Sequence, residues 1–137
     1  MSDVDEKSLR IGAIVVIEFV NDSKIDMVSS LAWGATSILL NRWLQRNGFR
    51  DLLRNLGRSS RGNLMLEVCF TVPLKTTLEL FVSELNQFIE NVNSFDKISA
   101  VEAFFNQKPI SGLNHSAPSD EIIDEDKGIW KQSSKQA

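Results

Sequence analysis

The strongest structural signal in this sequence lies between Leu74 and Phe95. Apolar residues recur there at alternating spacings of three and four, the pattern of an α-helix with one buried face; they are Leu78, Phe81, Leu85, Phe88, Val92 and Phe95. The pattern lasts for fewer than three heptads, which is too short for an isolated coiled coil. We therefore predict a helix over 74–95 that packs on a protein core.

Two other segments have the composition of buried β-strands. Residues 9–20 are rich in β-branched side chains, and apolar residues occupy both alternating faces of this segment. Residues 64–73 alternate in a similar way, and Pro73 closes the run because proline donates no backbone hydrogen bond. We predict one strand in each segment.

Helical spacing of apolar residues predicts three further elements. These are a helix from about Lys24 to Asn47, ended by Gly48, a short helix over 49–56, and a last short helix over 94–105. The predicted fold is a small helix-rich α+β domain in the order strand-helix-helix-strand-helix-helix. Because two strands rarely form a stable sheet alone, we expect self-association into a homo-oligomer to complete it.

The two ends of the chain differ in composition from its centre. We expect a flexible N-terminus at 1–8, a single domain at 9–109 and a disordered acidic tail at 110–137, because the polar ends bury too little apolar area to offset about 1–2 kcal/mol of ordering entropy per residue. No apolar stretch approaches the ~20 residues of a membrane-spanning helix. The single cysteine, Cys69, excludes an intrachain disulfide and favours a reducing, cytoplasmic location.

Positive charge is concentrated in one part of an otherwise acidic chain. Residues 42–66 carry six of the 15 basic residues and one of the 18 acidic residues, while the whole chain has a net charge of -3. In a continuous helix, residues four apart share one broad face. We therefore predict an anion-binding surface made by Arg42, Arg46, Arg50, Arg54, Arg58 and Arg61.

Three interpretations of this arginine set remain open. The side chains can form a solvated face that pairs with acids elsewhere in the fold. They can bind nucleic-acid phosphates, with strongly salt-dependent affinity, although the sequence has no zinc-finger spacing and no aromatic motif of the RNA-recognition type. They can also bind acidic protein segments, either on a partner or in this chain's own tail.

The tail and the first long helix contribute the other candidate binding residues. Acidic and apolar side chains are mixed in the tail, as in a short docking motif; they are Asp120, Glu121, Asp124, Glu125, Asp126, Ile129 and Trp130. The alternative is a solubilising end that binds nothing. Trp33 falls opposite the apolar stripe of its predicted helix, which makes it a candidate interface residue.

No motif indicates catalysis, a metal site or a cofactor. His115 is the only histidine and has no nucleophile motif around it, and one cysteine with one histidine cannot complete a structural zinc site. The leading hypothesis is a non-enzymatic adaptor or regulatory module that self-associates and binds acidic protein segments. The alternative is a nucleic-acid-binding accessory protein that uses the arginine set.

Overall fold

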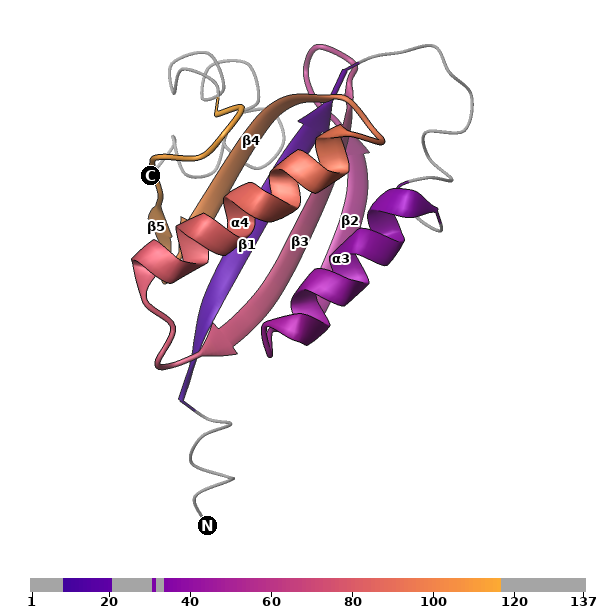
Figure 1. The fold of residues 1–137 in the computed structure, drawn as a ribbon. Helices are drawn as coiled ribbons and strands as arrows, with labels where there is room; N and C mark the ends of the chain where they lie inside the picture. The colour runs from indigo at the N-terminus through magenta and orange to yellow at the C-terminus, as the bar shows by residue number, and fades with distance from the viewer. Residues whose placement is uncertain (1–8, 21–30, 32–33, 117–137) are drawn as a thin grey trace.

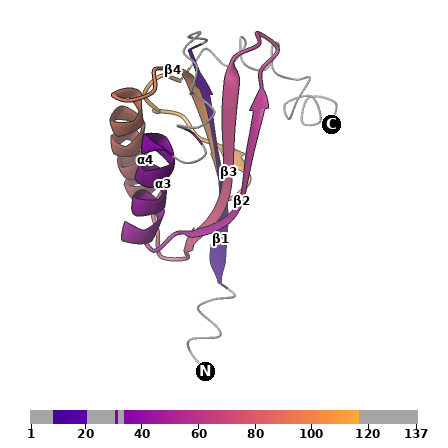
Figure 2. The same ribbon diagram turned by 90° about the vertical axis from the view of Figure 1, so that its right-hand side faces the viewer.

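The computed structural model describes residues 9–20, 31 and 34–116 of this protein. Its elements are, in chain order, β1 (Arg10–Phe19), α3 (Ala35–Arg46), β2 (Arg50–Arg58), β3 (Leu64–Pro73), α4 (Leu78–Asn93), β4 (Ile98–Phe105) and β5 (Lys108–Pro109). The strands form one antiparallel sheet in the order β2-β3-β1-β4-β5. Both helices cover the same face of this sheet (Figure 1), and Figure 2 shows the two layers side on.

The connectivity places β1 at the centre of the sheet, paired with β3 on one side and β4 on the other. The first six elements follow a β-α-β-β-α-β order, which is the ferredoxin-like motif, and β5 adds a short fifth strand next to β4. The outer strand at the opposite end of the sheet is β2, which pairs with β3. The predicted helix-rich order with two strands is therefore wrong, and five strands come from one chain without oligomerisation.

The predicted helix over 49–56 is instead strand β2. The prediction rested on the helical spacing of apolar residues, which are Phe49, Leu52, Leu53 and Leu56. Of these four only Phe49 is buried, and Leu53 and Leu56 point to opposite sides of the strand. Pairing with β3 therefore determines the structure of this segment. The turn after α3 was correctly placed, since Gly48 adopts a positive φ of 70° there.

The predicted last helix over 94–105 is strand β4. The register with β1 shifts at Phe19, so that Ile98 and Ala100 pair with neighbouring residues of β1. This β-bulge brings Ile98 and Val101 into the core although they are three residues apart. A bulged strand therefore produced the spacing that we interpreted as helical.

Three predicted elements are confirmed in type. The strands predicted over 9–20 and 64–73 are β1 and β3, and the helix over 74–95 is α4, which Thr77 caps by accepting a hydrogen bond from the amide of Leu80 at 3.1 Å. The described part of the predicted first helix is α3. Its predicted start near Lys24 lies outside the described residues.

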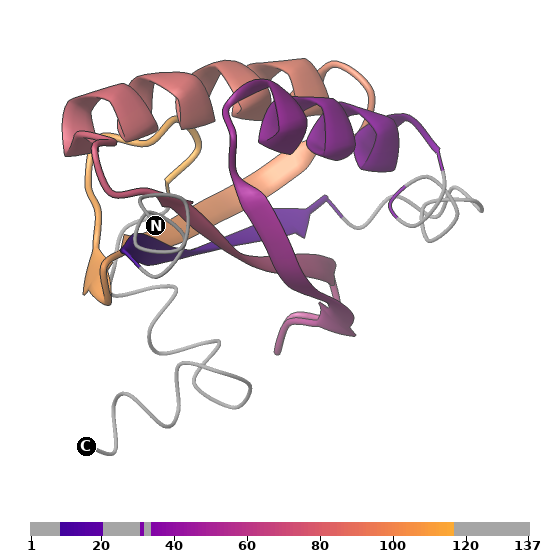
Figure 3. The same cartoon turned by 90° about the horizontal axis from the view of Figure 1, so that it is seen from below.

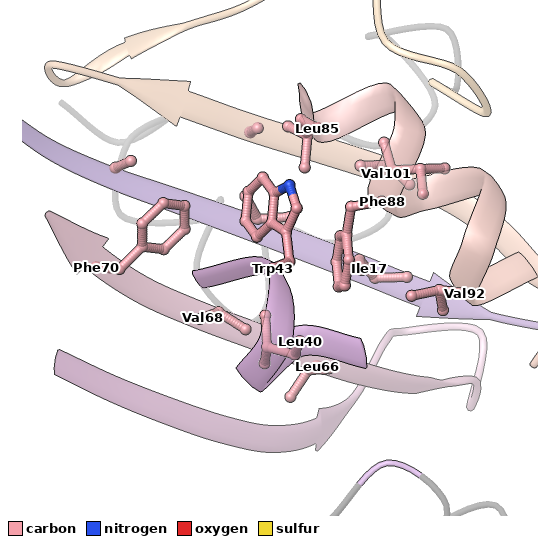
Figure 4. Close-up of a cluster of buried hydrophobic side chains, with 14 of the residues drawn as sticks. Ile17, Leu40, Trp43, Leu66, Val68, Phe70, Leu85, Phe88, Val92 and Val101 are labelled. Carbon is pink, nitrogen blue, oxygen red and sulfur yellow. The ribbon is translucent and has the colours of Figure 1, made fainter. Parts of the chain in front are cut away.

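Trp43 of α3 lies at the centre of the core between the sheet and α4 (Figure 4). Its ring stacks on Phe88 with centroids 4.8 Å apart and meets Phe49 and Phe70 edge to face. The indole Nε1 donates to the carbonyl of Glu84 at 3.1 Å, so its polar atom is satisfied despite burial. Trp43 is thus a core residue.

The packed chain continues past the predicted domain end at residue 109. Leu113 is buried in the core, and the amide of Val101 donates to the carbonyl of His115 at 3.1 Å, which places His115 beside the outer edge of β4. Asn114 also contacts α4, with its amide donating to Asn86 Oδ1 at 2.7 Å. Residues 110–116 therefore belong to the domain.

Candidate functional site

Apart from the two-residue strand β5, strand β2 is the most exposed element of the described chain. All of its nine residues are exposed except Arg54, which is half-buried. Three leucines lie on it, and their exposed fractions are 65% for Leu52, 53% for Leu53 and 40% for Leu56. Its inner side pairs with β3, and no described segment pairs with its outer side. β2 is therefore a long, partly apolar edge strand, which is a template for pairing with another chain.

The register with β3 shows which way each β2 side chain points. Arg54, Leu56 and Arg58 pair with Val68, Leu66 and Leu64, the core-facing residues of β3. These three therefore point to the side of the sheet that carries the helices. Leu53 and Asn55 point to the opposite side, which has neither helix (Figure 3).

The six arginines do not share one surface as predicted. Arg42 and Arg46 lie on α3, Arg50, Arg54 and Arg58 lie on β2, and Arg61 lies in the turn between β2 and β3. Even within β2 they divide, because Arg50 pairs with Thr71 and points away from the helices. The helical surface that we inferred is therefore absent, and a smaller cationic edge on β2 takes its place.

Three of the six arginines already have carboxylate partners. Arg61 Nη2 lies 2.7 Å from Glu18 Oε1, Arg54 Nη2 lies 2.8 Å from Asp51 Oδ2, and Arg46 Nη2 lies 3.4 Å from Glu84 Oε1. Among the described residues, no carboxylate forms an ion pair with the other three, which are exposed: Arg42, Arg50 and Arg58. The interpretation as a solvated, internally paired face thus applies to about half of the set.

The carboxylate of Glu18 organises the turn between β2 and β3. Glu18 is 3% exposed and accepts hydrogen bonds from Arg61, from Ser59 Oγ at 2.8 Å and from Asn63 Nδ2 at 2.7 Å. Burial alone would raise the pKa of Glu18, but these hydrogen bonds outweigh it and hold the pKa below its ordinary value. The network fixes the turn at the end of β2. No local sequence pattern indicates this network, because Glu18 and the turn are far apart in the chain.

The sheet face opposite the helices carries few aromatic residues. The outward alternation of the three central strands places Glu18, Glu67 and Glu102 on this face. Phe104 is the one aromatic residue that β1, β3 and β4 direct to it. A face of this kind lacks the row of aromatic side chains on which RNA-recognition sheets stack bases.

A pocket of about 420 Å³ lies at the end of the sheet where β1 begins and β3 ends, lined by Leu9, Arg10, Gly48, Pro73, Leu74 and Lys75. Arg10 spans one wall, where its Nη2 donates to the carbonyl of Gly48 at 2.7 Å and its Nε donates to Thr71 Oγ1 at 2.9 Å. Burial, and after it the charge of Arg50, lowers the pKa of Arg10. The side chain thus ties β1 to β3 and to the turn after α3.

Trp33 and the tail residues from Asp120 to Trp130 lie outside the described residues. In the part of the chain that the structure describes, no group of three His, Cys, Asp or Glu side chains is placed to hold a metal ion. No described helix is both long enough and apolar enough to cross a membrane.

No protein-family model matches the sequence, no match was found among curated proteins, and no solved structure matches the fold at a significant level.

Proposed function

We propose that this protein is an interaction module that binds an extended, acidic segment of a protein partner along the outer edge of β2. The observation that carries the proposal is the exposure of a nine-residue edge strand that includes three leucines. In an antiparallel sheet, every second residue of an edge strand directs its N–H and C=O away from the sheet. An incoming strand pairs with these groups, which supplies affinity, while side chains supply specificity.

The charges on β2 favour an acidic partner. Arg54 and Arg58 point to the same side with Leu56 between them, and Asp51 is the only acid on the strand. Opposite charges on directly facing residues of two strands stabilise their pairing, and like charges weaken it. A partner strand with acids two positions on either side of an apolar residue matches this pattern.

A protein partner fits the edge better than nucleic acid. Burial of the exposed β2 leucines under an apolar side chain of a partner is favourable. A phosphate backbone provides no apolar surface to cover them. Nucleic-acid binding by the arginine set is therefore the weaker of the two hypotheses.

Fluorescence polarisation with a short labelled peptide in which Asp and Ile alternate tests the proposal. We expect saturable binding that Arg58→Glu weakens by about five- to tenfold, because one favourable facing pair becomes a like-charge pair. The matched control is Arg42→Glu, which makes the same charge change at an exposed residue of α3 and leaves the affinity unchanged.

Two results would contradict the proposal. One is an equal loss of affinity for both variants, which would show that net charge and not the β2 edge attracts the peptide. The other is tighter binding of a generic single-stranded RNA than of the peptide at physiological salt, with the steep salt dependence that phosphate contacts produce. That second result would favour the nucleic-acid hypothesis.

A further inference from the structure

We infer that the β2 edge binds the acidic tail of a second copy of this chain, with residues 120–126 added as an antiparallel strand. The inference rests on the proposed function and names its partner. Self-association is here proposed for tail binding and not for completing the sheet, because one chain already forms all five strands.

The tail carries the pattern that the edge requires. On the helix-facing side of β2, Arg54, Leu56 and Arg58 follow one another at every second position. Asp120, Ile122 and Asp124 follow one another at the same spacing in the tail. Antiparallel pairing therefore sets Asp120 opposite Arg58, Ile122 opposite Leu56, and Asp124 opposite Arg54.

The same register is acceptable on the other side of the sheet. Ile123 falls opposite Asn55 and diagonal to the exposed Leu53, a distance over which larger side chains still make contact. Glu121 falls opposite Gly57, and no like charges face each other there. Glu125 falls opposite Leu53, so this side of the added strand is tolerated without being complementary.

Pairing of β2 with β2 of a second copy is less favourable. Such a pair, centred on Arg54, places the two Arg54 side chains opposite each other. Facing like charges destabilise a strand pair. An acidic strand removes this repulsion.

The position of His115 indicates that the docked tail comes from another copy. The amide of Val101 donates to the carbonyl of His115. Strand pairing places Ile17 opposite Val101, Leu66 opposite Ile17, and Leu56 opposite Leu66. These residues therefore form one row across the sheet. A strand docked on β2 is therefore five strand spacings from His115, about 24 Å at ~4.8 Å each. The five residues from His115 to Asp120 span at most about 17 Å. The chain's own tail cannot reach this register, whereas a second copy's tail can.

Analytical ultracentrifugation of the full chain over a concentration series tests the inference. We expect a concentration-dependent rise in mass, and we expect both Asp120→Lys with Asp124→Lys and Arg54→Glu with Arg58→Glu to weaken self-association by more than about tenfold. Mixing the two double variants restores association, because each tail then meets an edge of opposite charge. Misfolding of either variant could not produce this rescue.

The matched control is the pair of changes Glu121→Lys and Glu125→Lys, which alters the tail charge equally but on the other side of the added strand. We expect it to retain association. A full chain that stays monomeric at all concentrations, or a mixture that shows no rescue, would overturn the inference. If the alternating peptide still binds β2 in that case, the proposed function stands and only the identity of the partner is wrong.

Discussion

Glu18 and Arg61 form an ion pair that joins the central strand β1 to the turn after β2, with Arg61 Nη2 2.7 Å from Glu18 Oε1. The carboxylate is almost completely buried, while the guanidinium side chain is one-third exposed. This contact holds the turn at the end of the edge strand, so the shape of the proposed binding edge depends on a residue two strands away.

Removal of the Glu18 carboxylate is expected to destabilise the fold. Glu18→Ala leaves Arg61, Ser59 and Asn63 without their shared acceptor, and breaking a buried ion pair costs about 3 kcal/mol or more. Glu67→Ala is the control, because Glu67 lies on the same sheet face but is more exposed, and we expect a cost below about 1 kcal/mol. Urea denaturation measures both. Equal costs would show that the Glu18 network adds nothing specific.

The same network predicts a loss of stability in acid. The pKa of Glu18 lies below its ordinary value of 4.5 in the folded protein. As the pH falls through that value, the unfolded chain takes up the proton first, so the free energy of unfolding decreases until the folded-state pKa is passed. Glu18→Gln removes this contribution. Urea midpoints measured across the acid range are expected to fall less steeply for this variant, and parallel curves would refute the assignment.

Gly48 is expected to tolerate a side chain poorly because of its backbone conformation. Its φ is 70°, a region that L-residues rarely adopt, although an added Cβ would make only an ordinary contact with Pro73. We expect Gly48→Ala to cost about 1 kcal/mol or more. Gly12→Ala, in a strand with open space around the new methyl group, is expected to be nearly neutral. Thermal unfolding distinguishes them, and equal melting temperatures would be inconsistent with strain at Gly48.

Substitutions at Trp43 and at Leu53 are expected to affect different properties, the first the stability of the fold and the second the binding of the peptide. Trp43→Ala removes the centre of the aromatic core and is expected to cost about 3–5 kcal/mol. Leu53→Lys changes a residue that is 53% exposed, so it should change the free energy of unfolding by less than about 0.5 kcal/mol. It should nevertheless lower the affinity for the peptide. Denaturation and polarisation on both variants check this. A large loss of stability in Leu53→Lys would mean that the edge is part of the core.

Sequence patterns predicted the elements whose burial decides their structure. The alternation in β1 and β3 and the helical spacing of α4 reflect faces that pack on the core, so their residue types were informative. The prediction failed at β4, where a bulge distorted the alternation, and at β2, where leucines at helical spacing lie exposed on an edge strand. Local patterns also could not reveal Glu18, because its partners lie more than 40 residues away.

The candidate site was predicted in its charge but not in its geometry. The excess of arginine over acid between Arg42 and Arg61 is a property of the sequence, and part of it does lie on the edge strand. Which arginines remain available depends on long-range pairs such as Arg46 with Glu84, and these arise only when the chain folds. The leucines could be assigned to a binding edge only once the strand order showed that β2 is an edge strand.

Hydrogen exchange of the β2 amides tests the central claim most directly. Amides that point outward from an edge strand exchange freely unless another strand pairs with them. We predict that the alternating Asp and Ile peptide slows exchange within Arg50–Arg58 and leaves α3 unchanged. Protection that appears on α3 or elsewhere, while the β2 amides exchange at their original rates, would contradict a binding edge on β2.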